Sequence, residues 1–105
     1  MFQSMVIPVA DVEAAKKVYG ALAGEPHTDT PYYVGYNVDG FELALTPDNG
    51  VGAPVLHADV ADFDAARERL LAAGATEKVA PKEVAPGVRI CVLADPSGNP
   101  IGLRG

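Results

Sequence analysis

Residues 9–16 read V-A-D-V-E-A-A-K, and residues 60–67 read V-A-D-F-D-A-A-R. The two stretches are identical at five of eight positions and lie 51 residues apart. An apolar stretch precedes each copy, and a glycine follows each copy, Gly24 in the first half and Gly74 in the second. An internal repeat of this kind indicates a chain built from copies of one supersecondary unit. The repeat therefore predicts two similar modules.

Each copy predicts a strand followed by a helix. Apolar residues alternate along residues 4–9, which is the period of a strand, and Asp11 then stands where a helix N-cap belongs. In the second copy the strand covers residues 55–60, and Asp62 is the N-cap. On this second strand we expect Leu56, Ala58 and Val60 on one face, and Val55, His57 and Asp59 on the other.

Two hairpins follow the helices. Residues 32–38 and 41–46 flank Asp39-Gly40, a pair typical of a two-residue hairpin turn. Residues 88–94 and 100–104 flank D-P-S-G-N, which also favours a turn. An additional short strand is expected before each hairpin, at residues 27–30 and 77–84. Each half then reads strand, helix, strand, strand, strand.

The domain organisation follows from this order of elements. We expect one domain of 105 residues, with module one at about 1–46, a connector at 47–54 and module two at about 55–105. A ferredoxin-like βαββαβ sheet is the alternative, because it also has two strand–helix units. It is disfavoured because residues 32–46 supply a complete hairpin between the two units.

Composition narrows the class of protein. The net charge is −6 and no basic cluster is present, which argues against nucleic acid or an anionic membrane as a partner. No apolar run approaches the roughly 18 residues of a membrane span, and the first residues, M-F-Q-S-M-V-I-P-V, lack the pattern of a signal peptide. We expect a cytoplasmic protein. Its one cysteine, Cys91, lies in an apolar run and is expected to be buried.

The chain resembles the vicinal oxygen chelate superfamily, which includes glyoxalase I, extradiol dioxygenases, fosfomycin-inactivating enzymes and bleomycin resistance proteins. The resemblance rests on the two V-A-D motifs, on A-A-G-A at 72–75, and on D-P-S-G-N-P-I-G-L at 95–103, where the family commonly has D-P-x-G-N-x-I-E-L. It implies an α+β fold in which two βαβββ modules form a mixed sheet curled around a cavity. It also implies a homodimer.

The resemblance also implies where a metal would be bound. In the metal-dependent members the ligands lie on the first and last strands of each module. Matched to this sequence, the four positions hold Ser4, Ala44, Val55 and Gly102. None is a good ligand for a divalent metal, which prefers imidazole, carboxylate or thiolate. We therefore predict no metal and no cofactor. A shift of two residues would bring in Glu42 and His57 instead.

These observations predict a metal-free protein that binds a small molecule, such as an antibiotic or another planar metabolite. His57 and Glu42 would orient the ligand, and the small residues at the four former metal positions would enlarge its pocket. Tyr36 is expected to contact the ligand, whereas His27 is expected to be an exposed loop residue. The predicted ligand-binding residues are His57, Glu42, Ser4, Ala44, Val55, Gly102 and Tyr36, and no catalytic residue is assigned.

Two other functions remain open at this point. The chain could be a glyoxalase-like lyase or isomerase, or a dioxygenase, that uses displaced metal ligands or none. It could also be a dimeric scaffold without catalysis, in which case no cavity would be open. Under all three hypotheses the expected partner is a second copy of the chain. A small-molecule ligand is expected under the first two alone.

Overall fold

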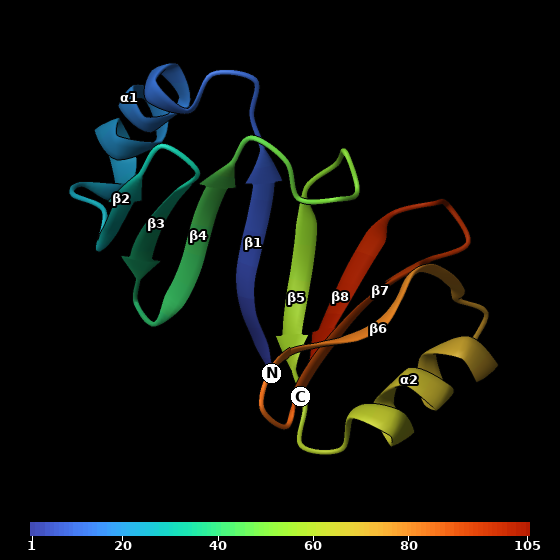
Figure 1. The fold of residues 1–105 in the computed structure, drawn as a ribbon. Coiled ribbons are helices and arrows are strands. Elements are labelled where there is room, and N and C mark those ends of the chain that lie inside the picture. Colours follow the sequence, from blue (N-terminus) through green and yellow to red (C-terminus); the bar gives the residue numbers. More distant parts are fainter. The chain divides into compact units, whose positions relative to one another are not determined.

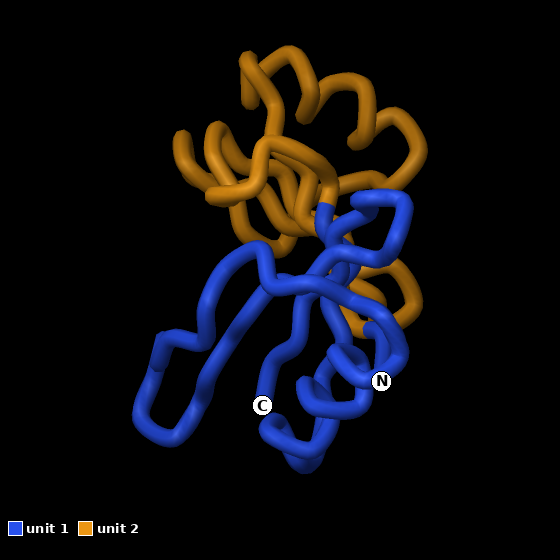
Figure 2. Tube along the Cα trace, turned by 90° about the vertical axis from the view of Figure 1, so that its right-hand side faces the viewer, with its two compact units in different colours: residues 1–2, 55–105 blue, residues 3–54 orange.

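The computed structural model describes all residues 1–105. It divides into two compact units, Gln3–Pro54 and Met1–Phe2 with Val55–Gly105, which are coloured separately in Figure 2. We call the first unit module one and the second module two. Residues 47–54, the expected connector, belong to module one. Each module is described by itself below.

Module one has one helix and four strands (Figure 1). In chain order these are β1 (Phe2–Pro8), α1 (Val12–Ala23), β2 (Thr28–Thr30), β3 (Tyr33–Val38) and β4 (Phe41–Thr46). The strands lie in the order β2-β3-β4-β1. β1 runs parallel to β4, and the other two pairs are antiparallel. The crossover connection between the parallel strands β1 and β4 therefore contains α1, β2 and β3.

Module two repeats this plan. Its elements are β5 (Val55–Asp59), α2 (Phe63–Ala72), β6 (Thr76–Ala85), β7 (Val88–Ala94) and β8 (Pro100–Arg104). The strand order is β5-β8-β7-β6, with β5 parallel to β8. The α+β class and the βαβββ pattern of both modules are confirmed. The ferredoxin-like alternative is wrong, because three strands follow each helix.

Local hydrogen bonds explain where the elements begin and end. The carboxylate of Asp11 accepts a hydrogen bond from the amide of Ala14 at 3.0 Å, and that of Asp62 accepts one from Ala65 at 3.1 Å. Both aspartates are therefore the N-caps that the repeat predicts. In the first hairpin Asp39 and Gly40 have φ angles of 53° and 85°, which a type I′ turn requires. Each of these helix caps and turns is formed by residues close together in the sequence.

The helix of each module covers one face of that module's sheet. In module one Val34, Tyr36 and Leu45 form the core against α1. In module two the buried core residues are Ala58, Phe63, Ala66, Cys91, Leu93 and Leu103. Cys91 is buried as predicted, and burial raises the pKa of its thiol. We call the opposite side of each sheet its open face. Neither helix is long and apolar enough to cross a membrane.

The strand register shows that the two modules are equivalent residue by residue. Val6 on β1 lies opposite Ala44 on β4. His57, which is 51 residues after Val6, lies opposite Gly102 on β8. Ala44 and Gly102 therefore occupy the same place in their modules, which confirms the alignment of the two hairpins. The strand neighbours of Ala44 and Gly102 pack in the two cores. Because residues alternate between faces along a strand, Ala44 and Gly102 lie on the open faces.

Candidate functional site

A hydrogen-bonded cluster of polar side chains surrounds Glu42 on the open face of module one. Oε1 of Glu42 lies 2.9 Å from Nε2 of His27, and the hydroxyl of Tyr33 donates a hydrogen bond to Oε2. The other ring nitrogen of His27, Nδ1, lies 2.9 Å from Oγ1 of Thr28. We call these four residues the Glu42 cluster. Both carboxylate oxygens and both imidazole nitrogens thus have partners.

Gly35 makes room for this cluster. It lies on β3 opposite Ala44, directly beneath the two rings. A Cβ atom on Gly35 would lie 3.0 Å from Nε2 of His27 and 3.0 Å from the Cε1 atom of Tyr33. Such contacts are closer than normal packing allows, so a side chain here would displace one ring or the other. The glycine within the strand is therefore part of how the cluster is built.

The protonation of Tyr33 fixes the direction of one hydrogen bond. Burial raises the pKa of its phenol, and the hydrogen bond and charge of Glu42 raise the pKa further. Tyr33 is therefore a neutral donor to the carboxylate at physiological pH. The side chains of His27 and Glu42 are 43% and 36% exposed, so a bound molecule could reach both. A carboxylate held between an imidazole and a phenol can bind a donor group or exchange a proton.

His57 occupies the open face of module two, where its imidazole lies against the backbone of Gly102. A Cβ atom on Gly102 would lie 2.2 Å from Nδ1 and 2.5 Å from Cε1 of this ring. Burial lowers the pKa of His57. The charge of Asp59 raises this pKa and the charge of Arg104 lowers it, and both effects are smaller than that of burial. The imidazole is therefore favoured in its neutral form. It fills the space that a side chain at position 102 would take.

The predicted ligand-binding residues fall into two groups, one in each module. Ser4, Glu42 and Ala44 lie on the open face of module one, where Ser4 is directly opposite Glu42. His57 and Gly102 are opposite each other on the open face of module two, and Val55 lies on the same side of β5 as His57. Glu42 and His57, the two polar candidates, are thus each beside one of the positions that the resemblance assigns to a metal ligand.

The prediction for Tyr36 is wrong. Its side chain is completely buried in the core between the sheet and α1. The hydroxyl donates a hydrogen bond to the backbone oxygen of Lys16 at 3.0 Å. Residues alternate between faces along a strand, so Tyr36 points away from the open face that carries Glu42. A ligand on that face could not touch it.

His27 and Tyr33 are members of the cluster that were not among the predicted ligand-binding residues. His27 was expected to be an exposed loop residue, and it does precede β2, but its ring reaches Glu42, 15 residues later in the chain. The distance along the sequence hides this contact. The one local signal was Gly35, because a glycine inside a strand often marks a close approach of other groups.

The side chains at the four implied ligand positions do not fit a divalent metal. Alanine, valine and glycine offer no ligand atom, and a neutral serine hydroxyl is a weak one. At position 102 the space is also filled, because the imidazole of His57 lies there. Within neither module do three or more His, Cys, Asp or Glu side chains converge to hold a metal ion. The side chains therefore depart at each position from the ligand pattern that the resemblance implies for the metal-dependent members.

Comparison with known families decides the classification. The family model of the glyoxalase-like domain matches residues 4–103. The chain belongs to the glyoxalase-like domain family. This match, with the fold, also supports the predicted place in the vicinal oxygen chelate superfamily. No curated protein matches the chain significantly.

Solved structures have the same fold at low sequence identity. A glyoxalase/bleomycin resistance protein/dioxygenase superfamily member from Vibrio splendidus is 16% identical, with a TM-score of 0.72, and the match covers 96% of this chain and 95% of that one. An NAD-dependent benzaldehyde dehydrogenase from Legionella pneumophila is 14% identical, with a TM-score of 0.76 and 96% coverage of both chains. At this identity the similarity concerns the fold alone.

Proposed function

We propose that this glyoxalase-like protein binds a small, planar or partly apolar molecule without using a divalent metal. One observation carries the proposal: the positions that the resemblance assigns to metal ligands hold Ser4, Ala44, Val55 and Gly102, and His57 fills the space beside the last of them. The chemistry that remains on the open faces is hydrogen bonding and stacking. Such groups orient ligands in binding proteins.

The Glu42 cluster is the proposed contact surface for the polar part of the ligand. Tyr33 and His27 hold the carboxylate in one orientation, and this preorganisation lowers the entropy lost on binding. The carboxylate would accept a hydrogen bond from an amine, amide or hydroxyl of the ligand. In module two the neutral imidazole of His57 is the polar group proposed for the open face of that module by itself.

The test combines a metal measurement with a ligand screen. Protein purified without a chelator and without an affinity tag is analysed for Zn, Ni, Mn and Fe, and is then screened by thermal shift against bleomycin and a set of aromatic antibiotics, with and without EDTA. We expect substoichiometric metal, and a stabilising ligand whose effect is unchanged by EDTA and lost in Glu42→Gln. Glu68→Gln, at an exposed carboxylate on α2, is the matched control. Stoichiometric metal that disappears in Glu42→Gln or His57→Gln would overturn the proposal.

A second candidate function is acid–base catalysis by the same cluster. The observation that favours it is the hydrogen bonding of one carboxylate to both an imidazole and a phenol. Such a carboxylate could remove a proton next to a carbonyl group, as a lyase or isomerase requires. Turnover of the methylglyoxal–glutathione hemithioacetal or of a catechol by the pure protein, abolished by Glu42→Gln and retained by Glu68→Gln, would favour the enzyme over the binding protein.

A further inference from the structure

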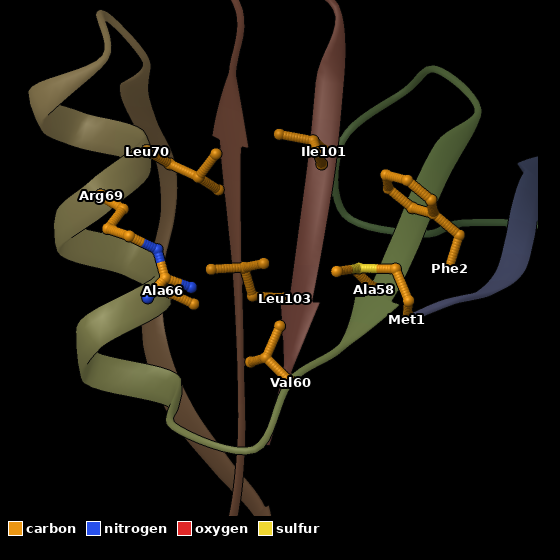
Figure 3. Close-up of a pocket in the computed structure, with 9 residues that line it drawn as sticks. All are labelled: Met1, Phe2, Ala58, Val60, Ala66, Arg69, Leu70, Ile101 and Leu103. Carbon is orange, nitrogen blue, oxygen red and sulfur yellow. The ribbon is translucent and has the colours of Figure 1, made fainter.

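Module two contains a cavity on the helix side of its sheet, away from the open face. The cavity has a volume of about 180 Å³ and lies between α2, the sheet strands β5 and β8, and the first two residues of the chain. Figure 3 shows Leu70 projecting from α2 over the sheet, and Met1 and Phe2 on the opposite side beside β5. Its mainly apolar lining includes Met1, Phe2, Ala58, Leu70, Ile101 and Leu103.

The size and lining of this cavity suit an aromatic ring or a branched alkyl group. An apolar cavity of about 150 Å³ in another protein takes up benzene. The exposed fractions of Met1 and Phe2 are 72% and 51%, so the walls are not closed over and a small molecule could enter. The backbone oxygen of Met1 accepts a hydrogen bond from the amide of Asp59 at 2.7 Å, which holds this wall against β5.

Charged groups without partners lie at the mouth of the cavity. A second, more polar hollow shares Met1, Val60 and Arg69 with the first and is also lined by Asp59 and Asp62. None of the five ion pairs of the chain includes Arg69, Asp59 or Asp62. Asp62 caps α2 through Oδ1 alone, which leaves its other carboxylate oxygen without a hydrogen bond. Asp59 contributes no carboxylate here, because its side chain lies on the same face of β5 as His57, the open face. The mouth therefore offers one free guanidinium and one carboxylate, that of Asp62.

We propose that this cavity binds a free α-amino acid with an apolar side chain. The side chain would enter the space beside Leu70 and Ile101, the carboxylate would pair with Arg69, and the ammonium group would pair with Asp62. A zwitterion fits this set of charges better than a simple anion, which would meet the carboxylate of Asp62, or a simple cation, which would meet Arg69. This site shares no residue with the Glu42 cluster and is independent of the function proposed above.

Three related probes test the proposal by NMR titration of the full-length protein. L-phenylalanine carries both charges, 3-phenylpropionate lacks the ammonium group, and 2-phenylethylamine lacks the carboxylate. We expect phenylalanine to shift the amide signals of Leu70 and Ile101 at millimolar concentration. Each of the other two should bind about tenfold more weakly, because each leaves one charged hydrogen bond unmade.

Two variants assign each charge to its partner. Arg69→Gln should weaken phenylalanine about tenfold and leave 2-phenylethylamine unchanged. Asp62→Asn, which keeps the N-cap, should weaken phenylalanine and leave 3-phenylpropionate unchanged. Glu68→Gln, next to Arg69 on α2 but outside the cavity, is the control and should change nothing. Equal binding of phenylalanine and 3-phenylpropionate, or no shift at Leu70 and Ile101 with any probe, would overturn the proposal.

Discussion

At the scale of single residues, Gly102 and His57 form a pair in which each determines the other. The imidazole stands where a Cβ atom of residue 102 would be, 2.2 Å from Nδ1. Gly102→Ala must therefore push His57 out of a half-buried position. We expect this variant to lower the free energy of unfolding by about 1–3 kcal/mol, the usual cost of overpacking. Urea unfolding followed by circular dichroism measures the loss.

A double-mutant cycle separates this contact from a backbone effect. In a His57→Ala background the space beside position 102 is open, so adding Gly102→Ala should cost little. The two substitutions should therefore be coupled by at least about 1 kcal/mol. Equal costs of Gly102→Ala in both backgrounds would show that the glycine is needed for its own conformation and not for the imidazole.

His57 should also make stability depend on pH. Burial lowers its pKa in the folded protein below the ordinary value of about 6.5. As pH falls below this value, the unfolded chain takes up the proton first, so it binds more protons than the folded chain and becomes favoured. Stability should thus decline as pH falls from 6.5 toward the folded pKa.

The measurement compares wild type with His57→Gln, which keeps a polar side chain of similar length but does not titrate. Urea midpoints are determined at several pH values on both sides of about 6.5. The wild type should lose more stability than the variant over this range. If the two curves stay parallel, the imidazole titrates alike in the folded and unfolded chains.

At the scale of elements, the two N-caps should contribute equally to their helices. Asp11→Ala and Asp62→Ala each remove the acceptor for a first-turn amide, and we expect each to lower the free energy of unfolding by about 1 kcal/mol. Asp11→Asn and Asp62→Asn are the matched controls, because asparagine caps as well as aspartate. Circular dichroism during urea unfolding measures each variant, and a loss as large in the asparagine variants would point to charge instead of capping.

The elements were largely predictable because their signals are local. Asp11 and Asp62 mark helix starts and Asp39-Gly40 marks a tight turn, whichever way the rest of the chain folds. β6 spans Thr76–Ala85, within one residue of the prediction at each end, but its three irregularities in register with β7 were not predicted. Such bulges depend on the partner strand, and nothing within β6 itself announces them.

The candidate site was less predictable than the elements, because its contacts join distant residues. Tyr33 and Tyr36 put one aromatic side chain on each face of β3, so the aromatic residues alone do not show which face meets α1. This is why Tyr36 was assigned to a ligand while it packs in the core. The tyrosine that belongs to the cluster is Tyr33, which lies on the other face of the same strand. It contacts Glu42, as His27 does, only because the hairpin and the loop before β2 bring the three residues together.

At the scale of the whole molecule, the chain has two hydrophobic cores that share no residue. Leu45→Ala in module one and Leu93→Ala in module two each remove a fully buried side chain, and each should cost about 2–5 kcal/mol. Hydrogen exchange measured by mass spectrometry should show faster exchange mainly in the module that carries the substitution. Equal acceleration in both modules would mean that the chain unfolds as a single unit.

The homodimer remains a prediction, which analytical ultracentrifugation would test.

The contact between His57 and Gly102 also restricts the order in which positions 57 and 102 can be substituted one at a time. A carboxylate at position 102, as in the family pattern, is incompatible with the imidazole, so residue 57 would have to become smaller first. Mutational paths in which position 102 changes first pass through a destabilised chain. The test is a library of variants in which positions 57 and 102 are both randomised and folded variants are selected. Variants with a side chain at position 102 should carry mainly glycine or alanine at position 57. Libraries that randomise one position alone would not show this dependence.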